Sequence, residues 1–163
     1  MILIERWTRD SIWSLLDIYG QLADLKNEYP NFSTWFSNKV VPDVLGGKRI
    51  IVIASDVKSK ELIGVMILKN STEKKICTLR VVAGHRGQGI GTELIKYALD
   101  YFDGAHPLVT VPEEHFTEYD KLFKSFGFKE MYAYSGYYRQ DKIEHAYNGY
   151  LIEDVDWING KRA

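Results

Sequence analysis

Continuous apolar runs rich in β-branched residues occupy the middle of the chain. "RIIVIAS" (49–55) and "ELIGVMILK" (61–69) are joined by the polar stretch "DVKSK", and "KKICTLRVV" (74–82) follows them. Runs without regular polar alternation are typical of strands covered on both faces. The first two predict a central antiparallel pair and the third a neighbouring strand, while "ILIER" (2–6) predicts a short strand at the beginning.

Before these central strands, apolar residues are spaced as in helices. They recur at this spacing over 12–22, after Thr8 and Asp10, two residue types that commonly cap helices. A second helix is expected over about 33–40, ended by Pro42 and the pair of glycines that follows it.

The second half continues the alternation of strands and helices. A helix follows the third central strand, "PLVTV" (107–111) predicts a strand, and an aromatic stripe over 116–126 predicts another helix with Gly127 as its C-cap. Two closing strands are expected over 128–138 and 143–152. The order β-α-α-β-β-β-α-β-α-β-β predicts a mixed α/β fold, in which helices cover both faces of a mostly antiparallel sheet.

Composition narrows the class of protein. The chain has 163 residues with 45% hydrophobic content, which predicts a single domain over 1–163 with a full core. A formal net charge of -1 gives no general attraction to nucleic acid or to an anionic membrane. The single cysteine, Cys77, excludes an internal disulfide framework, and no window has the apolar length of a membrane span or a signal peptide. We therefore expect a cytoplasmic protein.

The stretch "VVAGHRGQGIGTEL" places four glycines within eight residues where a strand leads into a helix that begins near Gln88. The first N–H groups of a helix have no internal partners, and small residues allow a phosphate to approach them. Arg86 adds positive charge. The stretch therefore predicts a site for phosphate or pyrophosphate, although a loop that binds no ligand remains the alternative.

Two common phosphate motifs do not fit this stretch. A Walker loop would need Lys and Ser or Thr after Gly89, where Ile90 stands, and a dinucleotide fingerprint would need glycine in place of Thr92. The sequence instead resembles the acetyl-CoA signature [R/Q]-x-x-G-x-[G/A] of the GNAT superfamily of N-acetyltransferases, with Arg86, Gly89 and Gly91 at the three marked positions. "LFKSFGF" resembles the second motif of that superfamily, in which a helix ends in Gly-Phe.

The resemblance covers nearly the whole chain and implies a GNAT-like fold. It also implies transfer of an acetyl group from acetyl-CoA to a primary amine by direct attack in a ternary complex. The acceptor would be a small molecule or a peptide, and a homodimer stays open. No metal is implied, and the four histidines show no spacing typical of metal ligands.

The resemblance further implies which residues meet the co-substrate. The strand before the loop would splay from "PLVTV", its residues Leu79, Arg80 and Val81 would pair with the pantetheine arm, and the N–H of Val81 would polarise the thioester carbonyl. The loop and helix start would hold the pyrophosphate through Arg86, Gly87, Gln88, Gly89, Ile90, Gly91 and Thr92.

Amine acetylation needs a base for the amine proton and an acid for the leaving thiolate. Many members of the superfamily use a tyrosine where this chain has Phe123. Tyr119 is a candidate acid, and the alternative is that it is an ordinary core residue. Glu113 and Glu114 are candidate bases, and the alternative is that they form a solvated acidic turn at the start of a helix.

Further residues join the candidates for the acceptor side. Glu28 could line the acceptor pocket or simply be exposed, and His115 follows the two candidate bases. Four tyrosines over 132–138 could bind the acceptor, and one of them could be the acid. Because Phe123 removes the usual acid, an acyl-CoA-binding regulatory module without efficient transfer is the alternative function. An unrelated phosphate or nucleotide binder is a third.

Overall fold

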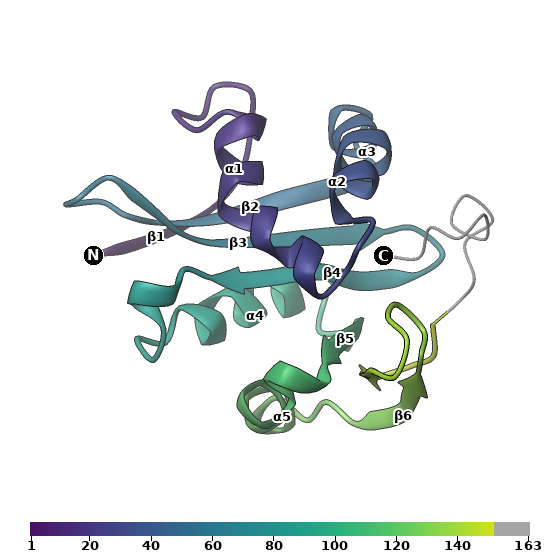
Figure 1. Ribbon diagram of the computed structural model, residues 1–163. Coiled ribbons are helices and arrows are strands. Elements are labelled where there is room, and N and C mark those ends of the chain that lie inside the picture. The colour runs from purple at the N-terminus through teal and green to yellow at the C-terminus, as the bar shows by residue number, and fades with distance from the viewer. Residues whose placement is uncertain (152–163) are drawn as a thin grey trace.

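In the computed structural model, which describes residues 1–151, one seven-stranded sheet runs in the order β1-β2-β3-β4-β5-β7-β6 (Figure 1). The strands are β1 (Ile2–Arg6), β2 (Arg49–Asp56), β3 (Glu61–Asn70), β4 (Lys74–Val81), β5 (Leu108–Pro112), β6 (Glu130–Ser135) and β7 (Ile143–Tyr147). The α-helices are α1 (Leu15–Leu22), α2 (Phe32–Trp35), α3 (Val41–Leu45), α4 (Ile90–Tyr101) and α5 (Phe116–Ser125). Neighbouring strands are antiparallel except for the parallel pair β4 and β5. The predicted fold class and the predicted order are confirmed. The last predicted strand was expected to reach Ile152, which lies outside the described residues.

Helices cover both faces of the central strands, as the unbroken apolar runs predict. Helices α1, α2 and α3 lie on one face and α4 on the other (Figure 1). Along β2, Ile51 and Ile53 pack into the core beneath α1–α3, while Ile50 and Val52 pack into the core against α4. Because each fully buried isoleucine contributes roughly 1.5–3 kcal/mol, these two cores hold the sheet as a rigid support for its edges.

The first helix begins later than its sequence suggests. Ser14 caps α1: its hydroxyl accepts a hydrogen bond from Asp17 N–H at 3.1 Å, and the Asp17 carboxylate accepts one from Ser14 N–H at 2.8 Å. The prediction of Thr8 or Asp10 as the cap is therefore wrong. This reciprocal capping box satisfies two backbone donors at once, which a single cap does not.

The second helical segment is longer and less regular than predicted. It comprises α2, a π-helical turn η2 (Phe36–Val40) and α3. Pro42 lies in the first turn of α3 instead of ending the helix, and Gly46 is the C-cap. Because proline has no N–H to donate to the preceding turn, it fits at this position, where the segment changes from π-helical to α-helical.

Strand β4 opens away from β5. Residues 75–76 of β4 pair with 108–109 of β5, and the parallel ladder then stops. At this point the register between β3 and β4 shifts, so that Cys77 is an extra residue in β4. A bulge bends a strand and increases its twist, which explains why β4 leaves β5 beyond Cys77. The splay that the resemblance implied is therefore present.

The end of α5 confirms the predicted cap at Gly127. Its φ is +77°, its N–H donates to Lys124 O at 3.0 Å, and Phe128 N–H donates to Phe123 O at 3.0 Å. This is a Schellman motif, whose apolar contact is the stack of Phe123 on Phe128. Phe123 is only 1% exposed, so the position at which many relatives carry a tyrosine belongs to the core. Within the described part of the chain, no helix is long and apolar enough to cross a membrane.

Candidate active site

Beyond the bulge, every second residue of β4 turns its backbone groups toward the gap between β4 and β5. Val82 N–H donates to Ile63 O of β3 at 2.9 Å, so it points away from β5. Because backbone groups alternate sides along a strand, Leu79 and Val81 turn their N–H and C=O groups toward the gap, whereas Arg80 turns its own toward β3. Val81 thus presents a fixed N–H donor where the two strands have separated.

Two side chains contact this exposed backbone. Tyr119 OH donates to Leu79 O at 3.3 Å, and Arg86 Nε donates to Val81 O at 3.2 Å. Both carbonyls therefore face away from β3, as the alternation requires. The Arg86 side chain folds back onto the end of β4, so the backbone of the loop that follows is left uncovered.

The loop before α4 has the shape of an anion cradle. Gly87 and Gly89 have φ of +78° and +81°, and a Cβ built on either one meets nothing within 4 Å. The first helical hydrogen bond is from Glu93 N–H to Gly89 O at 3.1 Å, so the N–H groups of the three preceding residues lie before it. Open space, positive φ and a helix start of eight or more residues together fit a pyrophosphate.

Gly91 has a different role from the other two glycines. Its φ is not positive, and an added Cβ would meet the Leu122 side chain at 3.4 Å and the Val81 side chain at 3.9 Å. At these distances a Cβ would make ordinary van der Waals contact, so Gly91 faces α5 and β4 but is not required for their packing. The Cβ position of Gly91 thus lies on the protein side of the helix, whereas that of Gly89 faces open space.

Tyr119 reaches the gap from α5. Its ring stacks on Phe123 with centroids 5.5 Å apart, and its hydroxyl is the group that bonds Leu79 O. Burial, more than the charges around it, raises the pKa of Tyr119 to about 12. The hydroxyl therefore keeps its proton at neutral pH. The ring of Tyr119 packs against the core, while its hydroxyl lies at the gap.

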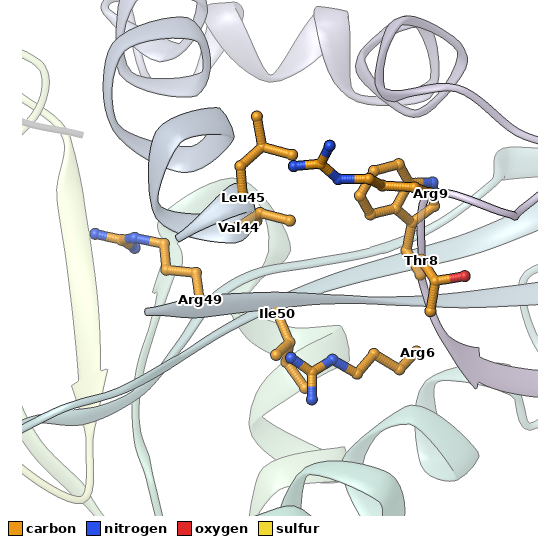
Figure 2. Close-up of a pocket in the computed structure, with 8 residues that line it drawn as sticks. Arg6, Thr8, Arg9, Val44, Leu45, Arg49 and Ile50 are labelled. Atoms are coloured by element: carbon orange, nitrogen blue, oxygen red, sulfur yellow. The ribbon is translucent and has the colours of Figure 1, made fainter. Parts of the chain in front are cut away.

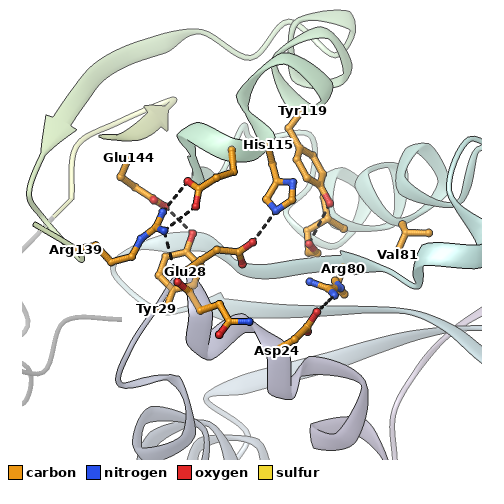
Figure 3. Close-up of polar contacts among 12 residues, drawn as sticks. Asp24, Glu28, Tyr29, Arg80, Val81, His115, Tyr119, Arg139 and Glu144 are labelled. Carbon is orange, nitrogen blue, oxygen red and sulfur yellow. Dashed lines mark hydrogen bonds and ion pairs between the residues drawn. The ribbon is translucent and has the colours of Figure 1, made fainter. Parts of the chain in front are cut away.

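The two predicted bases are engaged elsewhere. They lie in η4 (Glu113–His115), the 3₁₀ turn after β5. Glu113 Oε1 accepts a hydrogen bond from the N–H of Ile143 at 2.7 Å. Glu114 forms a bidentate salt bridge with Arg139, at 2.6 and 2.7 Å (Figure 3). The hydrogen bonds from Arg139 lower the pKa of Glu114 to about 2, which makes that carboxylate a very weak base. These contacts argue against either residue as the base.

The next residue, His115, is paired with Glu28. His115 Nε2 lies 2.6 Å from Glu28 Oε1, and the two side chains meet beside Tyr119 (Figure 3). Glu28 is the C-cap of η1 (Ala23–Asn27), and within residues 1–151 its second oxygen, Oε2, is buried with no hydrogen-bond partner. The sequence pointed to both residues separately, but they are 87 positions apart and no local pattern joins them.

The segment around η1 also contacts β4. Asp24 forms an ion pair with the Arg80 side chain (Figure 3). Glu28 contacts the turn after β5. Segment 24–28 thus spans the gap between the two diverging strands, with one polar side-chain contact to each side.

A buried carboxylate that sequence reasoning missed lies next to this segment. Glu144 of β7 is 3% exposed, and its Oε2 accepts hydrogen bonds from Tyr29 OH at 2.6 Å and Thr110 Oγ1 at 2.7 Å. Burial is the main cause that raises the pKa of Glu144 to about 7. In the sequence it looks like an ordinary polar residue of a closing strand, so no signal pointed to it.

A separate pocket of about 340 Å³ lies between the end of β1 and α3 (Figure 2). Arg6 and Arg9 line it, but Arg49 turns away to Asp43 and Cys77. None of its lining residues belongs to the predicted site. Across residues 1–151, no three residues of the metal-ligating types lie close enough together to hold an ion.

Comparison with known proteins identifies the family. Residues 46–130 match the acetyltransferase (GNAT) domain family, which is more than half of the chain, so the chain belongs to the GNAT acetyltransferases. No curated protein sequence matches the chain.

Solved structures agree with this fold. A protein described as a GNAT-family acetyltransferase from Desulfovibrio desulfuricans superposes with a TM-score of 0.69 at 11% identity, covering 90% of this chain and 97% of its own. An aminoglycoside 6'-N-acetyltransferase complexed with coenzyme A gives 0.64 at 18% identity, covering 89% and 94%. A spermidine N-acetyltransferase chimera from Vibrio cholerae and hSSAT gives 0.62 at 17% identity, covering 90% and 93%. At these identities the likeness is one of fold.

Proposed function

We propose that this protein transfers an acetyl group from acetyl-CoA to a primary amine by direct attack in a ternary complex. The observation that carries the proposal is the gap between β4 and β5. On one side the backbone N–H of Val81 faces it, and on the other side lies the His115–Glu28 pair. Membership of the GNAT family and the open cradle at Gly87 and Gly89 support acetyl-CoA as the donor.

The donor side acts through backbone groups. The N–H groups from Arg86 to Thr92 would hold the pyrophosphate, with the positive end of the α4 dipole behind them. Leu79 and Val81 would pair with the pantetheine arm along the edge of β4 that faces the gap, where Tyr119 and Arg86 now contact their carbonyls. The N–H of Val81 would then donate to the thioester oxygen as negative charge develops on it, which lowers the barrier because the donor is already fixed.

The acceptor side takes the proton. His115 Nε2 is committed to Glu28, so Nδ1 is the ring nitrogen that would accept the proton from the attacking amine. The C–N bond forms, the C–S bond breaks, and the amine proton is passed on so that the products are an amide and the free thiol. The Glu28 carboxylate stabilises the imidazolium that forms in between.

Tyr119 would assist the leaving group. Its hydroxyl now bonds Leu79 O and would turn to donate a hydrogen bond to the thiolate. Because its pKa of about 12 exceeds that of a free thiol, about 8.5, Tyr119 stabilises the thiolate by hydrogen bonding more readily than by full proton transfer.

The second candidate function is an acyl-CoA-binding module that does not transfer the acetyl group efficiently. Phe123 favours it, because a ring that is buried in the core offers no proton at the position where many relatives have tyrosine. In this case the loop would still bind acetyl-CoA, and no amine would release CoA.

The pH dependence of acetylation tests the proposal. His115→Asn should lower kcat for a reactive primary amine roughly 100-fold or more and leave acetyl-CoA binding unchanged, since only the base is lost. The low-pH limb of the kcat profile should disappear with it. His106→Asn is the matched control, because His106 packs on Phe128 away from the gap. If His115→Asn keeps both the rate and the low-pH limb, His115 is not the base.

A further inference from the structure

Glu144 has no part in the chemistry described above, yet it is the most buried carboxylate near the gap. It lies on β7 opposite Pro112 of β5, and it is 3% exposed. Both of the hydroxyls that bond it donate to the same oxygen, Oε2. A buried acceptor with two short hydrogen bonds is a strong local anchor, because breaking either bond leaves a polar group unsatisfied.

The two donors come from the segments that carry the proposed base. Tyr29 directly follows Glu28, and Thr110 lies on β5, the strand that leads into η4 and His115. One carboxylate oxygen therefore ties the Glu28 segment to the His115 strand. Tyr29 also packs edge-on against Tyr138 at 5.0 Å, which leaves its ring little freedom to move.

A second, more exposed contact joins the same two segments. Arg139 holds Glu114, the neighbour of His115, and its Nη1 also reaches Asn27 O at 3.5 Å. The last hairpin consists of β6, β7 and the turn between them. Two of its residues flank the His115–Glu28 pair, with Glu144 on the buried side and Arg139 on the exposed side.

We infer that Glu144 is a positioning residue for the base: through Tyr29 and Thr110 it holds Glu28 and His115 at hydrogen-bonding distance across the gap. The inference rests on the proposed function, in which His115 accepts the amine proton. It assigns to Glu144 no contact with either substrate.

The charges around Glu144 fit an anchor whose state depends on pH. Burial raises the pKa of its carboxyl to about 7, against the lowering effect of the Tyr29 and Thr110 hydroxyls and of two cations, Lys75 and Arg139. Glu28 is the other carboxylate facing this cluster from η1, and the Tyr138 hydroxyl faces it from the hairpin. Both hydroxyl hydrogen bonds favour the ionised carboxylate, but burial outweighs them, so the folded protein holds the Glu144 proton up to near neutral pH.

Three variants test the inference, each measured for kcat against pH, for acetyl-CoA affinity and for melting temperature. Tyr29→Phe removes one hydroxyl and keeps the ring, and it should lower kcat about tenfold with unchanged acetyl-CoA affinity and a displaced low-pH limb. Glu144→Ala should lower kcat at least as much. Glu144→Gln keeps an oxygen acceptor and should recover most of the activity.

Tyr19→Phe is the matched control, because it removes a tyrosine hydrogen bond to Ser33 that lies away from the gap. It should leave kcat and its pH profile unchanged. If Tyr29→Phe and Glu144→Ala keep the wild-type kcat and low-pH limb while only the melting temperature falls, Glu144 is a structural anchor and the inference is overturned. Should Glu144→Ala fail to fold, Tyr29→Phe alone decides. The inference fails by itself if His115→Asn abolishes the limb and Tyr29→Phe does not alter it; the proposed function fails if His115→Asn has no effect.

Discussion

The donor side and the acceptor side of this site are built in opposite ways. The donor side is one continuous stretch, residues 79–92, whose backbone groups face the gap and the helix start. The acceptor side is made of side chains from η1, from η4 and from the last hairpin, which is formed by β6, β7 and the turn between them. Hydrogen bonds and ion pairs join these side chains. A backbone site depends on φ values and open space, and a side-chain site depends on single atoms. Substitutions should therefore affect the two sides differently.

The largest expected effect is at the donor side. Gly89→Glu forces an L residue to φ of +81° and puts a carboxylate where the phosphates would bind, so acetyl-CoA affinity should fall about 1000-fold. Titration calorimetry measures it. Gly104→Glu is the control, because Gly104 has φ of +82° with nothing within 4 Å but lies beyond the other end of α4. Equal losses of affinity in both variants would show that strain, and not the cradle, is responsible.

The next effect concerns the buried carboxylate of the acceptor side. The pKa of Glu144 rises from 4.5 to about 7 on folding, so the folded protein holds this proton more tightly than the unfolded chain. Its contribution to stability is complete below pH 4.5 and is lost as the pH rises to 7, which amounts to about 3 kcal/mol. Glu144→Gln has no proton to lose and should not show this decline in urea unfolding at pH 4 and pH 8.

Glu118→Gln serves as the control for that experiment, because Glu118 is exposed on α5. Its unfolding free energy should follow the wild type at both pH values. A Glu144→Gln curve parallel to the wild type would mean that Glu144 titrates normally in the folded protein.

Tyr119→Phe should have a smaller effect, because it removes a hydrogen bond to the leaving thiolate and no binding contact. We expect kcat to fall about tenfold, with acetyl-CoA affinity unchanged. Steady-state kinetics with Tyr101→Phe, whose ring packs on Phe102 away from the gap, provides the comparison. Unchanged turnover would remove Tyr119 from the mechanism.

The smallest expected effect is at the exposed edge of the acceptor side. Arg139→Ala breaks the two-pronged pair with Glu114 and should raise KM for the amine a few-fold, since exposed ion pairs contribute only about 1 kcal/mol. Arg139→Lys should restore part of the effect. A fall in acetyl-CoA affinity instead would show that the two sides are not independent.

The same difference explains what the sequence could predict. Elements with strong periodicity, the Gly127 cap and the glycine loop are local features, and the structure contains each of them. The cap at Ser14 could not be singled out, because two other residues of cap type, Thr8 and Asp10, precede the same apolar stripe. Pro42 was misread because the π-helical turn before α3 has no sequence signal.

The acceptor side could not be predicted in this way. The His115–Glu28 contact spans 87 positions and the Glu144–Tyr29 contact spans 115, so only the fold brings these residues together. Glu113 and Glu114 stand beside His115 in the sequence and are acidic, which made them reasonable bases. Their engagement with Ile143 and Arg139 depends on how the last hairpin folds over the turn.

Amine-dependent release of CoA tests the central claim most directly. Wild type, His115→Asn and Gly89→Glu would be compared at saturating acetyl-CoA against a panel of primary amines, with the acetylated product identified by mass spectrometry. The account predicts release by the wild type, binding with release slowed roughly 100-fold or more in His115→Asn, and neither in Gly89→Glu. A wild-type protein that binds acetyl-CoA but does not release CoA in the presence of any amine in the panel would contradict the account. That result would establish the binding module instead.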